Sequence, residues 1–311
     1  MRVLELFAGA GGAALGLERA GLRHAALCEW DRDACATLRA AGLGPVVEGD
    51  VRDLAPVARA AGRVDVIWSS FPCQAWSRAG KRRGAADERN GWPWTVAALD
   101  RFRPAWFLGE NVRGLATHQG GCPGKAGGPL DPEGCPGCYL EGAILPDLRA
   151  RFAYADWWLL DAADYGVPQH RRRIVLWAGP RPLTRPAPTH GPGRAAPWVS
   201  MGEALGLRAR ADDGPLARPA PTVTTTEEKG TRATAASGYT FHGGPDRASD
   251  ALFLGTGRRR LTLAECAILQ DFPEEYPFQG SIGSRYRQIG NAVPPRLAEV
   301  VGRALLGAAG A

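Results

Sequence analysis

Cys73 directly follows the stretch 69–72 and an apolar run, residues 64–68, that is typical of a buried strand in a parallel sheet. Pro72 lacks a backbone N–H and has a fixed φ, so we expect the chain to leave the sheet and present Cys73 on a loop. Doubly wound sheets place their chemistry at this end of their strands. The basic stretch 77–84 suits a thiolate nucleophile acting on a polyanion. A buried cysteine in a turn is the alternative interpretation.

The first fifty residues predict a nucleotide-binding unit. An apolar strand at 3–7 leads into the glycine-rich turn 8–12 and then a helix at about 13–20. Strand, glycine turn and helix are the opening of a βαβ unit, in which the glycines let the backbone approach a ligand. The helix N-terminus favours a negative group on that ligand.

Acidic and aromatic residues at the next strand ends could complete this unit. Glu29 ends a predicted strand at 24–28 and lies twenty residues after Gly9, the spacing at which a carboxylate meets ribose hydroxyls. Trp30 would stack on an adenine or be a partly buried core aromatic. Asp50 follows a third predicted strand, around 45–47, and would accept from an adenine amino group or cap a helix.

Composition limits the class of protein. Hydrophobic residues make up 45% of the 311 residues, enough for one large domain and a smaller one. No apolar run is long enough for a membrane span and no signal peptide follows Met1, so we expect a cytoplasmic protein with no membrane partner. The seven cysteines are then expected to be thiols or metal ligands. Residues 180–260 hold 11 Arg and one Lys against 7 Asp or Glu, which indicates a nucleic-acid face or a solvated Arg-rich surface.

A series of motifs runs in one order from residue 3 to about residue 300. The stretches are 7–12, 29–31, 49–50, 71–74, 110–112, 165–173, 260–273 and 288–295. In residue type and order they resemble the motifs of the DNA (cytosine-5)-methyltransferase family, the C5-methyltransferases. One such motif is weak evidence, whereas the ordered set is highly specific.

The resemblance implies an α/β fold with a doubly wound, mostly parallel, Rossmann-like methyltransferase sheet. It implies a cofactor-binding and catalytic domain at 1–179, a small irregular target-recognition domain at 180–258, and a C-terminal segment at 259–311 that returns to the first domain. The implied function is S-adenosyl-L-methionine-dependent methylation of cytosine C5 in a specific double-stranded DNA sequence, after base flipping. We expect a monomer from a bacterium or archaeon, in some cases with a cognate restriction endonuclease as partner.

The residues at the strand ends suit this chemistry. Enzymes that methylate an exocyclic amine typically carry Asp/Asn/Ser-Pro-Pro-aromatic where this chain has Phe-Pro-Cys. Cytosine C5 is a poor nucleophile until a thiolate, here Cys73, adds to C6. Glu110, after the predicted strand 106–108, can hold a proton against ring N3, or alternatively cap a helix. Arg171 and Arg173 alternate and so share a face on an extended segment. The resemblance implies that they orient Glu110 or meet cytosine O2 and a phosphate; a solvated edge is the alternative.

The resemblance also implies the residues that bind the ligands. Those expected at the cofactor are Phe7, Ala8, Gly9, Gly11, Gly12, Glu29, Trp30, Asp50, Val51, Pro72, Asn291 and Ala292. Those expected at DNA are Gln74, Ser77, Arg78, Lys81, Arg82, Arg83 and Thr222. Phosphate contacts by the basic residues would clamp the duplex.

A cysteine-rich insert at about 118–140 departs from the family pattern. Cys135 and Cys138 have the spacing of a zinc knuckle, Cys122 precedes them, and His118 is the nearest fourth ligand. We expect a structural zinc site here. Surface thiols or a disulfide are the alternatives, and a reducing cytoplasm disfavours the disulfide.

Two other functions fit the same motifs. The tRNA-cytosine branch of the family carries a Cys-Phe-Thr signature that this chain lacks. A catalytically inactive DNA-binding homologue is disfavoured by the presence of Cys73, Glu110, Arg171 and Arg173. An assay of methyl transfer to duplex DNA and to tRNA would distinguish these two functions from DNA methylation.

Overall fold

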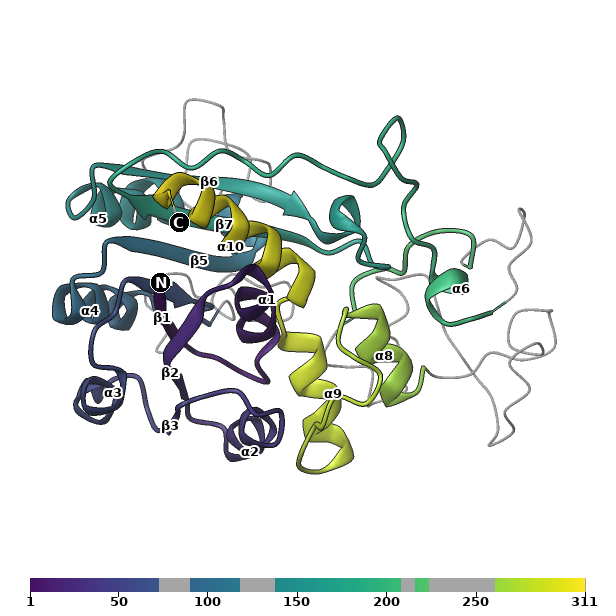
Figure 1. The fold of residues 1–311 in the computed structure, drawn as a ribbon, viewed down its shortest axis with the longest axis horizontal. Helices are drawn as coiled ribbons and strands as arrows, with labels where there is room; N and C mark the ends of the chain where they lie inside the picture. Colours follow the sequence, from purple (N-terminus) through teal and green to yellow (C-terminus); the bar gives the residue numbers. More distant parts are fainter. Residues whose placement is uncertain (73–89, 118–137, 208–215, 224–260, 311) are drawn as a thin grey trace.

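A seven-stranded sheet forms the centre of the computed structural model, which describes residues 1–72, 90–117, 138–207, 216–223 and 261–310 (Figure 1). The strand order is β3-β2-β1-β4-β5-β7-β6, with β7 antiparallel to both of its neighbours and the other pairs parallel. The expected doubly wound, mostly parallel sheet is confirmed. The strands are β1 Arg2–Leu6, β2 Arg23–Glu29, β3 Val46–Glu48, β4 Val66–Ser69, β5 Trp106–Val112, β6 Tyr154–Asp161 and β7 Arg172–Gly179.

Helices cover both faces of this sheet, because successive strand residues point to opposite faces. Leu4 and Leu6 of β1 pack with α3, α4 and α5, whereas Val3 packs with α1 and α10. The longer helices are α1 Gly12–Ala20, α2 Arg32–Ala40, α3 Leu54–Ala61, α4 Trp92–Phe102, α9 Ile282–Asn291 and α10 Pro295–Ala309. The shorter ones are η2 Arg113–Ala116, the π-helical η3 Leu140–Ile144, α5 Leu145–Arg149, η4 Ala162–Tyr165, α6 Met201–Ala204 and α8 Leu263–Leu269.

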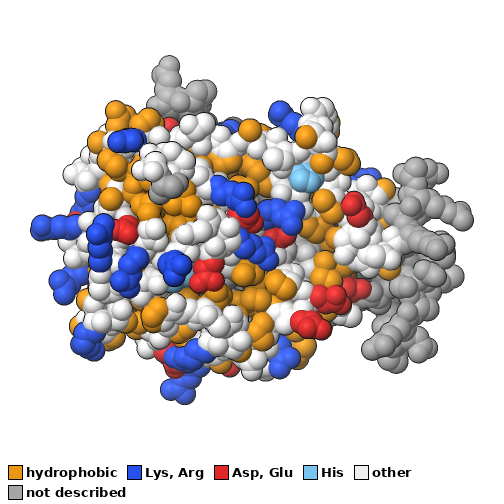
Figure 2. Space-filling view, viewed as in Figure 1, with side chains coloured by type: hydrophobic (Ala, Val, Ile, Leu, Met, Phe, Trp, Pro, Cys, Tyr) orange, Lys and Arg blue, Asp and Glu red, His pale blue; other side chains and the backbone are white. Residues whose placement is uncertain are grey.

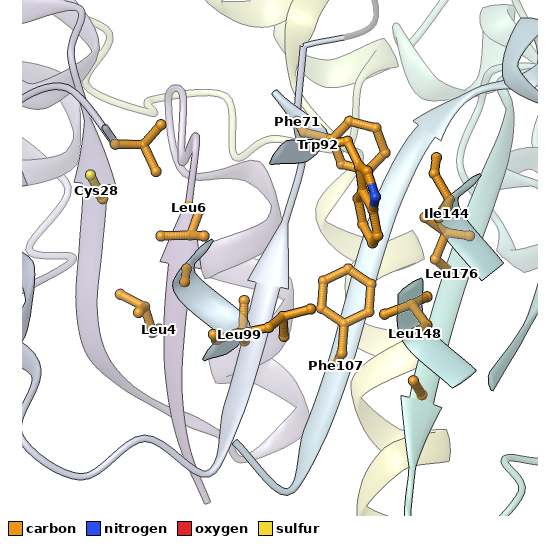
Figure 3. Close-up of a cluster of buried hydrophobic side chains, with 14 of the residues drawn as sticks. Leu4, Leu6, Cys28, Phe71, Trp92, Leu99, Phe107, Ile144, Leu148 and Leu176 are labelled. Atoms are coloured by element: carbon orange, nitrogen blue, oxygen red, sulfur yellow. The ribbon is translucent and has the colours of Figure 1, made fainter. Parts of the chain in front are cut away.

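Three aromatic rings fill the core beneath the end of β4 (Figure 3). The Phe71 and Trp92 ring centroids lie 5.4 Å apart, and those of Trp92 and Phe107 lie 5.9 Å apart near a right angle. The indole Nε1 of Trp92 also donates to Asp147 of α5 at 2.8 Å. These contacts fix residues 71–72, which lead directly into Cys73.

The C-terminal helix α10 packs on the first helix, α1. A Cβ atom added to Gly16 of α1 would overlap the carbonyl oxygen of Pro295, and one added to Gly302 of α10 would lie 2.9 Å from Cβ of Ala20. Glycine at both positions therefore lets the two backbones approach closely. This brings Ala292 and Val293, which precede α10, beside Gly12 at the end of the glycine-rich turn.

A capping box fixes the start of α8. Thr262 and Glu265 form it, each side chain accepting from the other residue's backbone N–H. The helix ends at Leu269, and Asp271, with a φ of 69°, has left the helical conformation.

The face that carries α1 and α10 has charges of both signs (Figure 2). Arg303 pairs with Glu299 at 2.6 Å, and Arg296 lies 3.4 Å from Asp271. This face is therefore not a uniformly basic surface. Most of the basic segment predicted at 180–260 lies outside the described residues. None of the described helices is long and apolar enough to cross a membrane.

Candidate active site and cofactor-binding residues

The carboxyl ends of β1, β4 and β5 are neighbours in the sheet and carry the predicted site residues. The amide Nδ2 of Asn111, at the end of β5, donates to the carbonyl of Phe71 at 3.1 Å and so ties the two strand ends together. A Cβ atom on Gly91 would lie 3.0 Å from side-chain atoms of Phe7 and Phe71, so residues 71–72 and 90–91 meet closely. Cys73 itself lies outside the described residues.

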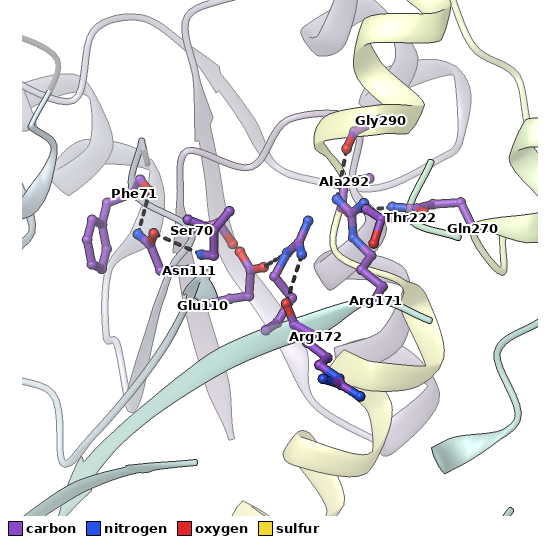
Figure 4. A network of polar contacts seen from close by, with 12 residues as sticks. Ser70, Phe71, Glu110, Asn111, Arg171, Arg172, Thr222, Gln270, Gly290 and Ala292 are labelled. Carbon is purple, nitrogen blue, oxygen red and sulfur yellow. Dashed lines mark hydrogen bonds and ion pairs between the residues drawn. The ribbon is translucent and has the colours of Figure 1, made fainter. Parts of the chain in front are cut away.

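Glu110 is a buried carboxyl group held by one arginine. It is 8% exposed, and its Oε1 lies 2.9 Å from Nε of Arg173 (Figure 4). Burial raises the pKa of Glu110 above its ordinary value, and the charges of Arg173 and Arg171 oppose that shift without cancelling it. A raised pKa makes this carboxyl group easier to protonate, so that it can present a proton to a ring nitrogen.

Arg171 has a different set of partners from Arg173. Its guanidinium, 1% exposed, donates to the carbonyls of Val223 at 3.0 Å, Gly290 at 2.8 Å and Ala292 at 2.9 Å (Figure 4). The expectation of a shared face relied on strand alternation. Because β7 begins at Arg172, Arg171 precedes the strand and that alternation does not include it.

The Glu29 carboxylate contacts the glycine-rich turn. Its Oε2 accepts from the backbone N–H of Gly9 at 2.7 Å, and its Oε1 accepts from those of Trp30 and Asp31 at 2.9 Å. Burial raises the pKa of Glu29, although these hydrogen bonds favour the charged form. Two features that the sequence places twenty residues apart therefore form one structural unit.

Backbone geometry explains the glycines of this turn. Gly9 and Gly11 have φ values of 54° and 86°, in the left-handed region that favours glycine. A Cβ on Gly12 would overlap the carbonyl of Val293 and lie 3.2 Å from Cβ of Ala292. The structure thus brings the turn together with Ala292, one of the two residues predicted at the cofactor from the C-terminal segment.

Two alternatives left by the sequence can now be decided. Trp30 is 73% exposed, so it is not a core aromatic and its ring is open to a ligand. Asp50 is not a helix cap, since Asp53 caps α3 by accepting from the backbone N–H of Ala55. Asp50 instead accepts from Nε of Arg52 at 2.8 Å, which holds the pKa of Asp50 below its ordinary value.

Several predicted site residues lie outside the described residues. They are Cys73, Gln74, Ser77, Arg78, Lys81, Arg82, Arg83, His118, Cys122 and Cys135. Of the zinc set, Cys138 is described, and it is buried just before η3. Within the described ranges no group of three or more His, Cys, Asp or Glu residues could hold a metal ion. Thr222, expected at DNA, donates its hydroxyl to the carbonyl of His170 at 2.8 Å.

Sequence reasoning gave no role to two buried glutamines. Gln169 and Gln270 are both 0% exposed, and Nε2 of Gln169 donates to Oε1 of Gln270 at 2.6 Å. Both glutamines lie inside motif stretches, Gln169 in 165–173 and Gln270 in 260–273, and this position could have indicated a role for them.

Comparison with known proteins supports one family. Residues 1–127 and 208–307 match the family model described as C-5 cytosine-specific DNA methylase. The Type II methyltransferase M.NaeI of Lentzea aerocolonigenes is 35% identical over 97% of this chain and 74% of its own. M.NgoMIV of Neisseria gonorrhoeae is 33% identical over 97% of this chain and 96% of its own.

Solved structures share the fold. The S. pombe Dnmt2 methyltransferase superposes with a TM-score of 0.70 at 16% identity, over 99% of this chain and 98% of its own. A variant of Spodoptera frugiperda DNMT2 gives a TM-score of 0.65 at 18% identity, over 98% and 99% of the two chains.

Proposed function

The chain belongs to the C-5 cytosine-specific DNA methylases, enzymes that transfer a methyl group from S-adenosyl-L-methionine to DNA, and we propose that it methylates cytosine C5 in one double-stranded sequence. The observation that carries the proposal is the buried Glu110–Arg173 pair at a strand end next to residues 71–72. It supports a proton-holding group beside the position from which Cys73 would act. Base flipping brings the cytosine there, because stacking hides C6 in the duplex.

In the proposed reaction this chain's residues activate the cytosine, and the methyl donor leaves as S-adenosyl-L-homocysteine. The Cys73 thiolate forms a bond to C6 while the Glu110 carboxyl group protonates or hydrogen-bonds N3, so that electron density moves to C5. When bound, S-adenosyl-L-methionine supplies an electrophilic methyl group on a sulfonium. After C5 has gained the methyl group, loss of H5 as a proton to a base breaks the bond to C6 and releases the Cys73 thiolate. Arg173 keeps the Glu110 carboxyl group in place throughout.

The residues at the first strand ends fit the cofactor. The left-handed Gly9 and Gly11 open the backbone to a ligand, and the exposed Trp30 ring suits stacking on an adenine. Asp50 retains acceptor capacity for an adenine amino group beside its contact with Arg52. Ala292, which lies against Gly12, supports the assignment of Asn291 to the same ligand.

We also propose double-stranded DNA as the partner and a restriction-modification setting in a prokaryotic cytoplasm, with the protein acting as a monomer. The relatives' designation as Type II methyltransferases supports that setting. The basic residues 78–83 and the segment around Thr222 would meet DNA phosphates. Under this proposal each phosphate contact removed should reduce the log–log slope of binding against salt by about one.

The proposed zinc site would use Cys122, Cys135, Cys138 and His118. The spacing of the two later cysteines supports it. Elemental analysis of the purified protein should find one zinc per chain, and Cys135→Ala should lose the metal together with part of the thermal stability. If the purified protein contained no metal and had full stability, the zinc site would be rejected, and the proposed methyltransferase function would not be affected.

Transfer of a tritiated methyl group tests the function. We expect incorporation into duplex DNA and none into tRNA, with sequencing of methylated bases in an expressing host giving the target site. Transfer to tRNA would favour the RNA branch of the family. Failure to label either substrate would favour an inactive DNA-binding homologue.

A further inference from the structure

A single peptide carbonyl joins two distant parts of the chain. The oxygen of Ala292 accepts from Nη2 of Arg171 at 2.9 Å and from Nε2 of Gln270 at 2.6 Å. The same Nη2 donates to the carbonyl of Gly290 at 2.8 Å (Figure 4). The peptide that carries Asn291 is therefore fixed on both sides by side chains from other segments.

Arg171 and Gln169 also hold residues 220–223, which lie within the expected target-recognition domain at 180–258. Nη1 of Arg171 donates to the carbonyl of Val223 at 3.0 Å, and Oε1 of Gln169 accepts from the N–H of Val223 at 2.9 Å. Backbone bonds between residues 168–170 and Ala220 continue this contact. Residues 220–223 are thus attached to the stretch that leads into β7.

A hydrogen bond between the glutamines closes the cluster. Nε2 of Gln169 donates to Oε1 of Gln270 at 2.6 Å and to the carbonyl of Leu269 at 2.9 Å. Gln169, Arg171 and Gln270 are each no more than 1% exposed. Because the three side chains are buried, a hydrogen bond lost from this cluster would leave a polar group without water as a replacement partner.

Burial makes this cluster stiff. Moving Val223 relative to residues 290–292 would break several hydrogen bonds and leave buried polar groups without partners. The guanidinium group of Arg171 adds to this stiffness, because one rigid planar group bonds both to Val223 and to the peptide that carries Asn291. A ligand that holds or displaces one peptide therefore acts on the other through these side chains.

We propose that Gln169, Arg171 and Gln270 form a positioning cluster that couples DNA binding to cofactor binding. The inference depends on the proposed function, in which Asn291 contacts the cofactor and the segment beginning at Thr222 contacts DNA. Arg171 is then a positioning residue, whereas Arg173 acts on the target cytosine by holding Glu110 in place.

The coupling is measured by titrating S-adenosyl-L-homocysteine into the full chain with and without a saturating duplex that contains the mapped methylation site. In the unmodified protein the duplex should tighten binding by about 5-fold or more, the lower end of typical coupling between two sites. Thermodynamic reciprocity requires S-adenosyl-L-homocysteine to tighten duplex binding by the same factor.

Gln270→Glu tests the cluster with little change in shape. The substitution keeps the acceptor for Gln169 and removes the amide donor to the Ala292 carbonyl. We expect the coupling factor to fall towards one while each ligand alone largely retains its affinity. Arg171→Lys keeps the positive charge but loses the planar guanidinium, so it should also lower the coupling factor towards one. It is the alternative test if Gln270→Glu does not fold.

Gln288→Glu is the matched control. It makes the same substitution at a buried glutamine on the helix of Asn291, where Nε2 bonds the carbonyl of Gln279 at 2.9 Å and Oε1 accepts from Thr37. These contacts do not reach Val223, so the coupling factor should persist. A folded Gln270→Glu or Arg171→Lys protein with full coupling, or an unmodified protein with none, would overturn the proposal. Absence of methyl transfer by the unmodified protein would instead reject the proposed function.

Discussion

Nε of Arg173 lies 2.9 Å from Oε1 of Glu110, across two antiparallel strands. In the β5–β7 register Arg173 is opposite Val112, so Arg173 and Glu110 are diagonal neighbours on the same face of the sheet. The sheet thus sets this contact, and the neighbouring loops do not have to adjust to form it. A carboxyl group with a raised pKa is kept in one orientation by a residue that cannot be deprotonated.

Glu110→Gln should slow methyl transfer by about 10²- to 10⁴-fold, because the amide cannot exchange the proton held against N3. In the unmodified protein the rate should also fall as pH rises through the raised pKa of Glu110, and the variant should lack that dependence. Single-turnover transfer between pH 5.5 and pH 9 measures both effects. Glu203→Gln, at an exposed carboxylate on α6, is the control. A variant as fast as the unmodified protein would exclude the proposed role of Glu110.

Glu29→Gln should weaken cofactor binding. The carboxylate accepts from three backbone N–H groups, among them that of Gly9, and a buried charge-assisted hydrogen bond contributes about 1.5–3 kcal/mol. Loss of one such bond corresponds to on the order of tenfold or more in Kd. Calorimetric titration with S-adenosyl-L-homocysteine measures it, with Glu48→Gln at the exposed end of β3 as control. An unchanged Kd would show that Glu29 does not position the turn for the cofactor.

Glycine-to-alanine substitutions at two helical positions should have opposite effects. Gly16→Ala forces a Cβ into the carbonyl of Pro295 and should destabilise the fold by about 1–3 kcal/mol. Gly307→Ala, where nothing lies within 4 Å of the added Cβ, should stabilise α10 by about 0.5–1 kcal/mol. Urea midpoints of the two variants test the prediction. Equal midpoints would contradict the close packing of α1 on α10.

Glu5 should make stability depend on pH. It is 1% exposed, and its Oε2 has no hydrogen-bond partner within the described part of the chain. Burial, followed by the charges of Glu29 and Glu18, raises the pKa of Glu5 well above its ordinary value. The folded state therefore keeps a proton that the unfolded state releases, so stability falls as pH rises from the unfolded pKa towards the folded one.

Glu5→Gln removes this dependence. The melting temperature of the variant should exceed that of the unmodified protein at pH 8, and the difference should shrink at pH 5.5. The same difference at both pH values would show that Glu5 does not carry the proton.

Local sequence signals predicted several strand ends and turns, but not the long-range contacts around them. Strand ends followed by glycine or proline located the turn at 8–12 and residues 71–72, because those residue types restrict the local backbone. Strand β6, α4 and α9 were not predicted; α9 contains Gly283 and Gly290, which disfavour a helix locally. Tertiary packing overrides that preference, since both glycines lie among the buried residues of α9.

The coupling cluster depends on long-range contacts. Gln169 and Gln270 are 101 residues apart, and Arg171 reaches Ala292 across 121 residues. No local sequence pattern indicates partners this far apart. The orientation of Arg171 was also not predictable, because it depends on β7 beginning at Arg172. The glutamines are polar residues at fully buried positions, and burial is known only once the sheet and the C-terminal helices are assembled.

The most direct test of the proposed chemistry is covalent trapping with a duplex that carries 5-fluorocytosine at the mapped target position. Fluorine replaces H5, and a base cannot remove it from C5 in the way that it removes a proton. The reaction should therefore stop after methyl transfer, with the Cys73 sulfur still bonded to C6. We expect one protein–DNA adduct that survives a denaturing gel, requires S-adenosyl-L-methionine, and is absent with Cys73→Ser, which should still bind S-adenosyl-L-homocysteine. An unmodified protein that methylates ordinary duplex but forms no adduct, or an adduct that persists in Cys73→Ser, would contradict it.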